Sequence, residues 1–246
     1  MPLSVAAVFL AISILFLTGH ALQAQQISLD FGNQGSLTLR SIQLFSLVTL
    51  LSLVPGLAIM ITCFPFMVTV FSILRQAIGL QQAPPNMMII SLALFLTYFV
   101  MEPVFNQAWA DGIDPLIKGT IGPDQAFKLA MAPFQSFMQS RIDPDTLKAL
   151  LNARGMATTA STSMPPDLAT LLPAFLLSEI QRAFEIGFLI FLPFLIIDLV
   201  VAAVLMSMGM MMVPPAIVSL PFKLAFFVIA DGWSLIASAL VRSYPM

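Results

Sequence analysis

The strongest constraint on this chain is a run from Ile186 to Leu240 that is almost entirely apolar yet contains Asp198, Lys223 and Asp231. A charged side chain at the centre of a membrane helix costs roughly 2.5–3.5 kcal/mol on insertion scales. Such charges persist where they face a partner group, water or another subunit. The run therefore favours a pore or gate over a simple membrane anchor.

The composition of the whole chain agrees with a membrane location. Hydrophobic residues make up 59% of the 246 positions and charged residues 9%, whereas soluble domains have about 45–50% apolar and about 25% charged residues. A formal net charge of −2 gives no indication of a nucleic-acid partner. The single Cys63 lies in an apolar stretch and is expected to pack as a small hydrophobe. The single His20 has no Cys or His nearby, so an ordinary metal site is not expected.

Residues 1–21 predict a secretory signal peptide. The apolar run Val5–Leu17 has 13 residues, which is short for a membrane span of about 20, and small residues suited to cleavage follow it. No Lys or Arg precedes the run, so a short first anchor helix is the alternative. We expect residues 22–246 to form one membrane unit.

A charge-free segment from Ser41 to Leu74 is too long for one ordinary span, with 34 residues. Pro55 and Pro65 interrupt it, and a proline inside a helix removes a hydrogen bond and crowds the preceding turn. The segment predicts one broken helix, or two shorter helices joined by a kink. Gly79–Asn86, which contains two prolines, predicts a turn.

The next apolar helix is expected over Met87–Met101, with a stop at Glu102–Pro103. Residues 102–172 hold 12 of the 22 charged residues and are predicted to form a polar helical region on the periplasmic side. Helical spacing of apolar residues predicts amphipathic helices over Pro123–Met138 and Pro144–Ala153. The first stripe consists of Phe127, Ala130, Phe134 and Phe137, and the second of Leu147, Leu150 and Leu151.

Residues 173–246 predict a C-terminal helical hairpin that turns at Pro214–Pro215. Asp198 and Lys223 would lie at similar depths, roughly 12–16 Å from the tip, because a helix rises about 1.5 Å per residue. We expect them to pair, either across the hairpin or between neighbouring copies, since burying both charges unpaired is costly. A proton-relay role for Asp198 stays open.

A second charged cluster consists of Glu179, Arg182 and Glu185, which are three residues apart and share one helix face. It is interpreted either as local charge balance at a membrane boundary or as a ring of contacts between subunits. The sequence has no Ser-His-Asp, Cys-His or HExxH arrangement and no Gly-rich phosphate loop. No catalytic, cofactor-binding or metal-binding residue is therefore predicted.

Five methionines lie within seven residues at the hairpin tip: Met206, Met208, Met210, Met211 and Met212. Methionine is unbranched and polarizable, so it adapts to varied surfaces. Gly209 and the following prolines favour a non-helical loop, which is tolerated at membrane depth only inside protein or beside water. The methionines are interpreted as lipid-facing or core filler, or as a compliant seal around a channel.

Several motifs occur in an order and spacing that resembles the FliP family of flagellar type III export-gate proteins. They are PAFLLSEIQRAFEIGF at 173–188, PFLIIDL at 193–199, MGMMMVPP at 208–215, LPFK at 220–223, DGW at 231–233, LRQAIG at 74–79, PPN at 84–86 and FVMEP at 99–103. The likeness covers about residues 40–245 and is weakest over 105–170. The apparent signal peptide favours the flagellar branch over the virulence-secretion counterpart.

The resemblance implies an all-α integral membrane protein of the bacterial inner membrane and the flagellar basal body. Several copies would assemble with two small subunits, FliQ-like and FliR-like, into a cone of helical hairpins on which an FlhB-like switch protein docks. Unfolded flagellar proteins would pass through its pore. Met210, Met211 and Met212 would form a gasket, with Met206 and Met208 near. The family is not enzymatic and needs no cofactor, and hydropathy would overcount spans where apolar faces contact other subunits.

One stretch departs from the family pattern. Cys63–Phe66 stands where the family usually has a Ser-Phe-Thr-Arg-like sequence, so a proline is gained and a charge is lost there. Two other classes of function fit the sequence less well. A self-contained ion-coupled transporter with Asp198 as its ion site would usually be built from repeats, and no repeat is visible. An intramembrane enzyme would need a nucleophile or a metal set at depth.

Overall fold

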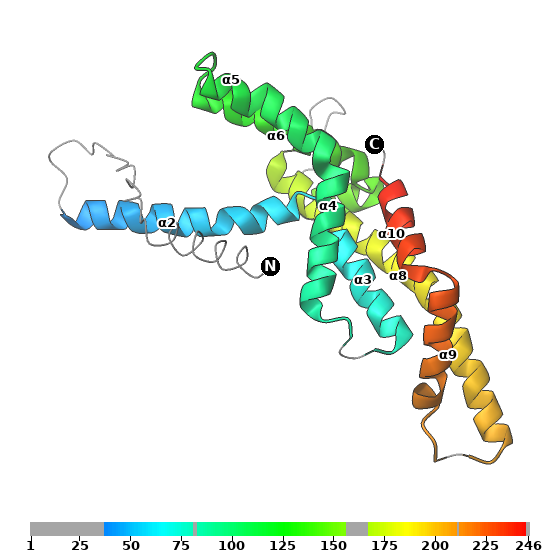
Figure 1. Cartoon of the computed structure of the whole chain (residues 1–246). Coiled ribbons are helices and arrows are strands. Elements are labelled where there is room, and N and C mark those ends of the chain that lie inside the picture. Colours follow the sequence, from blue (N-terminus) through cyan, green and yellow to red (C-terminus); the bar gives the residue numbers. More distant parts are fainter. Residues whose placement is uncertain (1–36, 81–82, 156–166, 211, 245–246) are drawn as a thin grey trace, which may run out of the picture. The chain divides into compact units, whose positions relative to one another are not determined.

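The computed structural model describes residues 37–80, 83–155, 167–210 and 212–244, and every regular element in these ranges is helical (Figure 1). The prediction of an all-α fold is confirmed. The predicted signal peptide, residues 1–21, lies outside the described part. The chain divides into two compact units, residues 1–50 and 51–246. In the first unit, the described residues belong to helix α2 (Leu37–Met60).

The remaining helices belong to the second unit. They are α3 (Phe64–Ile78), α4 (Asn86–Ala108), the π-helix η1 (Trp109–Ile113), α5 (Asp114–Ile117), α6 (Pro123–Arg141), α7 (Pro144–Ala153), α8 (Leu168–Ser207), α9 (Pro215–Ile229) and α10 (Gly232–Arg242). Among the described residues, three stretches are long and apolar enough to cross a membrane, namely Ser41–Met60, Asn86–Ile117 and Leu168–Ser207. The bent pair of α9 and α10 would add a fourth if it forms one span.

The charge-free segment over residues 41–74 forms two helices, which was one of the two predicted outcomes. The break falls at Ile61–Cys63, between α2 and α3. Pro65 lies in the first turn of α3, where its missing N–H would have had no partner within the helix. Pro55 is accommodated inside α2.

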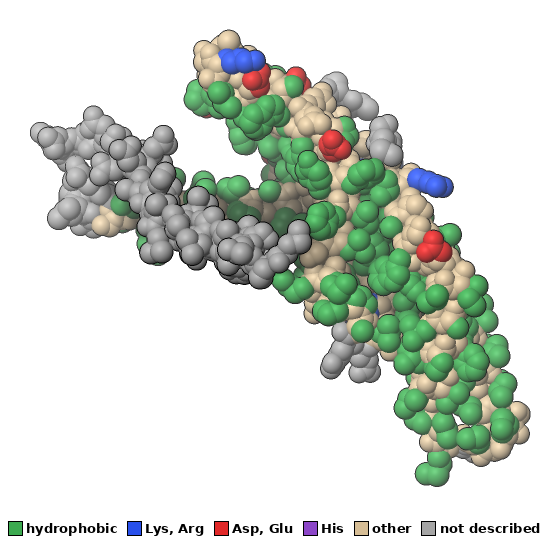
Figure 2. All heavy atoms as spheres, viewed as in Figure 1, with side chains coloured by type: hydrophobic (Ala, Val, Ile, Leu, Met, Phe, Trp, Pro, Cys, Tyr) green, Lys and Arg blue, Asp and Glu red, His purple; other side chains and the backbone are tan. Residues whose placement is uncertain are grey.

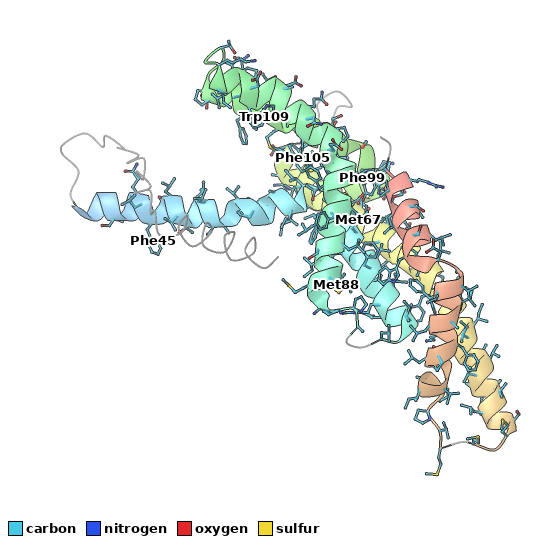
Figure 3. All side chains as sticks on the ribbon, viewed as in Figure 1. Phe45, Met67, Met88, Phe99, Phe105 and Trp109 are labelled. Carbon is cyan, nitrogen blue, oxygen red and sulfur yellow. The ribbon has the colours of Figure 1, made fainter. Side chains whose placement is uncertain are left out.

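The predicted stop at Glu102–Pro103 is wrong, because α4 continues through Pro103 to Ala108 and passes into η1. Proline removes one helix hydrogen bond, but tertiary packing outweighs that loss. Met101 is completely buried, and the ring of Phe105 lies 5.8 Å from that of Phe134 on α6. Figure 3 shows Phe105 and Trp109 on this continuous stretch.

Both predicted amphipathic helices exist, as α6 and α7, and the bounds of α7 agree with the prediction. Phe134 and Phe137 pack against the core as expected. Phe127 does not, since 64% of it is exposed. Ala126 is buried in its place because η1 crosses this half of α6 closely: a Cβ at Gly112 would lie 2.6 Å from the Cβ of Ala130.

The core of the second unit surrounds α3, which packs along α8 and against α4. Its fully buried large side chains include Phe66, Met67, Phe71 and Leu74. The hairpin of α8 and α9, in contrast, carries many apolar side chains on its surface, and Figure 2 shows them on the visible face. Apolar surface of this extent indicates contact with lipid or with other protein chains.

The return arm of the predicted hairpin consists of two helices, α9 and α10. It bends by 60° between α9 and α10. Asp231 at the bend has a positive φ of 46°. A Cβ at Gly232 would lie 2.1 Å from the ring of Phe227, which also packs edge-on against Trp233 at 5.4 Å. Close aromatic packing on a glycine thus holds the bend.

Candidate functional site

The methionine-rich segment forms a loop at the hairpin tip, as predicted. Helix α8 ends at Ser207, and Gly209 follows with a φ of 74°. The N–H of Gly209 donates to the carbonyl of Met206, and the N–H of Met210 donates to that of Leu205. These two bonds and the left-handed glycine constitute a Schellman cap. Pro215 then starts α9, so the change of direction is encoded locally at both ends of the loop.

The described methionines of this loop, and Met206 in the last turn of α8, are largely exposed in the single chain. The exposed fractions are 60% for Met206, 66% for Met208, 42% for Met210 and 98% for Met212. Met211 lies outside the described residues. A flexible thioether side chain with this exposure is free to pack against whatever surface approaches the tip.

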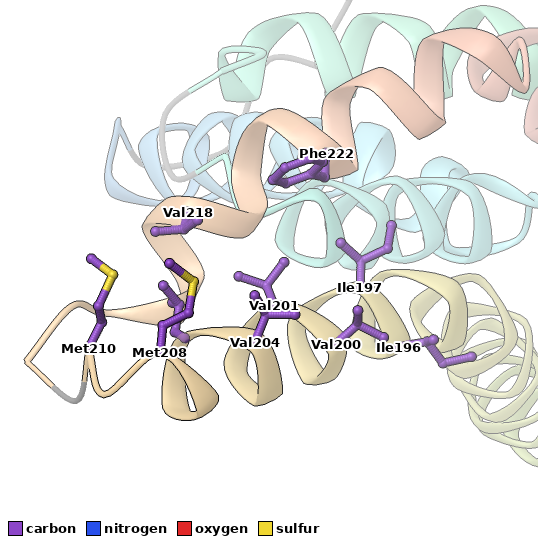
Figure 4. Close-up of a pocket in the computed structure, with 10 residues that line it drawn as sticks. Ile196, Ile197, Val200, Val201, Val204, Met208, Met210, Val218 and Phe222 are labelled. Carbon is purple, nitrogen blue, oxygen red and sulfur yellow. The ribbon is translucent and has the colours of Figure 1, made fainter.

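An apolar cavity of about 540 Å³ opens between the arms of the hairpin behind the loop. Figure 4 shows Met208 and Met210 from the loop, Val218 and Phe222 from α9, and aliphatic side chains from α8 around it. Its lining contains no charged side chain. The tip is therefore apolar both on its surface and behind it, and it offers no chemistry beyond packing.

Asp198 and Lys223 meet across the hairpin within a single chain. Nζ of Lys223 lies 2.6 Å from Oδ2 of Asp198, and the hydroxyl of Ser219 donates to Oδ1 at 2.5 Å. Nζ also donates to the backbone carbonyl of Ala77 at the end of α3, at 3.2 Å. Lys223 is 5% exposed. Its charge is compensated by one carboxylate and one helix-end carbonyl.

Glu179 is completely buried in a second polar cluster. Nε of Arg141 donates to Oε1 of Glu179 at 2.8 Å, and the hydroxyl of Tyr244 donates to Oε2 at 2.5 Å. The guanidinium of Arg141 lies 4.0 Å from the centre of the Tyr244 ring and also donates to the carbonyl of Ser243. The cluster joins α6, α8 and the residues after α10. Burial, and then the charge of Glu179, raise the pKa of Tyr244 well above its ordinary value.

The other two members of the predicted cluster lie at its edge. Nη1 of Arg182 is 3.5 Å from Oε1 of Glu179. Glu185 is exposed and accepts a hydrogen bond from Gln181 at 3.2 Å. Arg141, Tyr244 and Ser219 were not identified from the sequence. Ser219 lies one helical turn before Lys223, and this spacing was the available signal.

The stretch that departs from the family pattern is part of the core. Cys63 and Phe66 are fully buried. The ring of Phe66 packs edge-on against Tyr244 at 5.6 Å, and the Arg141 guanidinium lies 6.0 Å from its centre. Burial raises the pKa of the Cys63 thiol to about 12, which agrees with packing as a small hydrophobe. Within the described ranges, no group of three or more His, Cys, Asp or Glu side chains could hold a metal ion.

Comparison with known proteins is consistent across nearly the whole chain. The model of the FliP family matches residues 47–240. The flagellar biosynthetic protein FliP of Agrobacterium fabrum is 47% identical over 94% of this chain and 96% of its own length. The protein of the same name from Aquifex aeolicus is 44% identical over 95% of this chain and 98% of its own. That of Bacillus subtilis is 45% identical over 83% and 92%.

Proposed function

Because this chain belongs to the FliP family, we propose that it is a subunit of the flagellar type III export gate. It acts in the bacterial inner membrane at the flagellar basal body and forms part of the pore through which unfolded flagellar proteins leave the cytoplasm. Its role is to build and close a conduit, and it carries out no enzymatic reaction.

The observation that carries the proposal is the methionine loop. A seal that closes on itself and also yields to varied polypeptides must be apolar, deformable and free of rigid secondary structure. The loop offers three described methionines with exposed side chains, and exposed Met206 precedes them in the last turn of α8. The ends of the loop are defined by a Schellman cap and a proline helix start. Met210, Met211 and Met212 form the gasket of the proposed pore, and Met206 and Met208 support it.

The apolar surface of α8 and α9 supports assembly with other membrane chains. Several copies of this chain associate with FliQ-like and FliR-like subunits into a cone, and an FlhB-like protein docks on it. Part of residues 102–172 lies on the periplasmic side. In such an assembly some apolar helices contact neighbouring subunits instead of lipid, so the number of true spans is smaller than hydropathy suggests.

The seal is tested by replacing Met210, Met211 and Met212 together with Ala in the co-expressed complex. Small ions and solutes should then leak across the inner membrane, because shorter side chains leave the passage open. The matched control replaces Met87 and Met88, which are 74% and 62% exposed on α4. An assembled loop variant with unchanged permeability would refute the seal.

The alternative is a self-contained ion-coupled transporter that uses Asp198. The ion pair with Lys223 and the hydrogen bond from Ser219 satisfy this carboxylate within the chain, which favours a structural role. Purification in mild detergent distinguishes the two functions. A ring-shaped complex with two small membrane subunits agrees with the gate, whereas a stable active monomer would favour the transporter.

A further inference from the structure

We infer that Lys223 is a positioning residue for the methionine loop, because it ties the hairpin that carries the loop to the carboxyl end of α3. The consequence for sealing rests on the proposed function. The tie itself is a property of the single chain and can be measured separately.

The carboxyl end of α3 provides an acceptor that its own helix does not use. The last carbonyls of a helix lack intrahelical partners. Gly79, with a φ of 90°, donates its N–H to the carbonyl of Gln76, and the carbonyl of Ala77 receives the Lys223 ammonium at 3.2 Å. A positive charge at a helix C-terminus also interacts favourably with the helix dipole. Lys223 therefore caps α3 from a different helix.

One nitrogen atom thereby connects three helices. Lys223 belongs to α9, its carboxylate partner Asp198 to α8, and its carbonyl partner Ala77 to α3. Side chains of α9 contact the end of α3 at this point. A Cβ built at Gly79 would lie 3.5 Å from Cδ1 of Leu220 and 4.0 Å from Nζ of Lys223.

Along the hairpin, Lys223 lies between the methionine loop at the tip and two sites that allow bending. Pro193 lies inside α8, and Asp231 marks the 60° bend between α9 and α10. Pro193, Ala230 and Gly232 line the same cavity of about 310 Å³, so the proline of α8 and the bend of the return arm face one another. Helices bend most readily at such sites. Residues 194–229 carry the loop, and their contacts with α3 therefore limit bending of this part of the hairpin. The hydrogen bond from Lys223 to Ala77 is a polar contact of this kind.

The test compares two variants of the full chain in a Cys63→Ala background. Lys223→Met with Asp198→Asn removes the tie without leaving a lone buried charge. Asp198→Asn alone leaves the Lys223 charge without its carboxylate, which lowers stability, but it keeps the lysine donor to Ala77. Nitroxide labels at Gln76 and Phe222 report the distance between α3 and α9. A second label pair at Leu199 and Ile217, which are 67% and 69% exposed, reports the hairpin itself.

We expect the double variant to broaden the α3–α9 distance distribution, while Asp198→Asn alone and the label pair within the hairpin remain as in the parent. In the assembled complex, the double variant should also raise the ion leak about tenfold, as expected for losing one hydrogen bond from a charged donor that favours the closed state. The inference would be overturned if the double variant and Asp198→Asn gave the same α3–α9 distance distribution. It would also be overturned if the double variant broadened the distance distribution within the hairpin as much as that between α3 and α9.

The loop variants separate this inference from the proposed function. If the methionine variants leak and the lysine double variant does not, the seal stands and the positioning role of Lys223 is refuted. If no variant leaks, the seal is refuted, and the label distances still decide whether Lys223 holds the hairpin against α3.

Discussion

Replacing Tyr244 by Phe removes one hydroxyl from the buried cluster of Arg141, Glu179 and Tyr244 and leaves the aromatic ring in place. The ring keeps its contacts with Phe66 and with the Arg141 guanidinium. Glu179 is 0% exposed, so water cannot replace the lost donor on Oε2. Hydrogen bonds to charged groups contribute about 1.5–3 kcal/mol. We therefore expect the free energy of unfolding to fall by about 1.5–3 kcal/mol, measured by reversible denaturation in mixed micelles.

The chain provides a matched control, because it contains two tyrosines. Tyr98 is 64% exposed, and Tyr98→Phe should change the free energy of unfolding by less than about 0.5 kcal/mol. Equal losses from the two substitutions would refute the assignment of Tyr244 as a partner of a buried carboxylate.

Removing the cation should cost more than removing the hydroxyl. Arg141→Met leaves Glu179 as a buried charge, and breaking a buried pair from one side costs about 3–5 kcal/mol. Adding Glu179→Gln to that variant should recover part of the loss, since no carboxylate then remains to be compensated. A double variant that is less stable by the sum of the two single effects would show that the side chains do not interact.

Three further predictions address pH and close packing. The pKa of Tyr244 is raised above its ordinary value of 10.0. The contribution of the protonated Tyr244 to stability is therefore complete below about pH 10 and is lost as the pH rises further. Tyr244→Phe should reduce this alkaline loss of stability in denaturation curves. The N–H and hydroxyl of Thr146 lower the pKa of Asp143 below 3.8, so the start of α7 is stabilised above about pH 4 and weakened at lower pH. Asp143→Ala should remove this acid dependence and speed amide exchange at Thr146, whereas Asp145→Ala should not. Gly112→Ala would place a Cβ 2.6 Å from that of Ala130 and should cost about 1–3 kcal/mol in thermal or chemical denaturation, whereas Gly122→Ala, with no atom within 4 Å, should be nearly neutral.

Features that depend on neighbours in the chain were predictable from the sequence. The start of α7 at Pro144, the loop at Gly209 and the turn before Asn86 follow from the conformational limits of proline and glycine. The pairing of Asp198 with Lys223 was also accessible, because a hairpin with a defined tip brings its two arms to matching depths. Each of these inferences needed the geometry of one helix or one hairpin.

Features that depend on tertiary packing were not predictable in the same way. Pro103 would end an isolated helix, yet contacts of α4 and η1 with α6 keep the helix continuous. Arg141 and Tyr244 lie 38 and 65 residues from Glu179, and no local pattern connects them. Phe127 belongs to a helical stripe but stays exposed because small residues occupy the crossing with η1.

The distribution of charge indicates how this chain meets its neighbours. The ammonium of Lys223 and the carboxylate of Glu179, both buried, find their partners within one chain. The exposed surface of α8 and α9 is mainly aliphatic, aromatic and methionine. In the proposed assembly, contacts between subunits along the hairpin should therefore be dominated by apolar packing, which salt screens little, unlike interactions between exposed charges. Glu185 and the partly exposed Arg182 are the charged groups of this cluster left near the surface of the chain, and the side chain of Asp198 is 37% exposed further along α8. In the proposed assembly, charged contacts of α8 with another subunit would therefore involve these two levels of the helix.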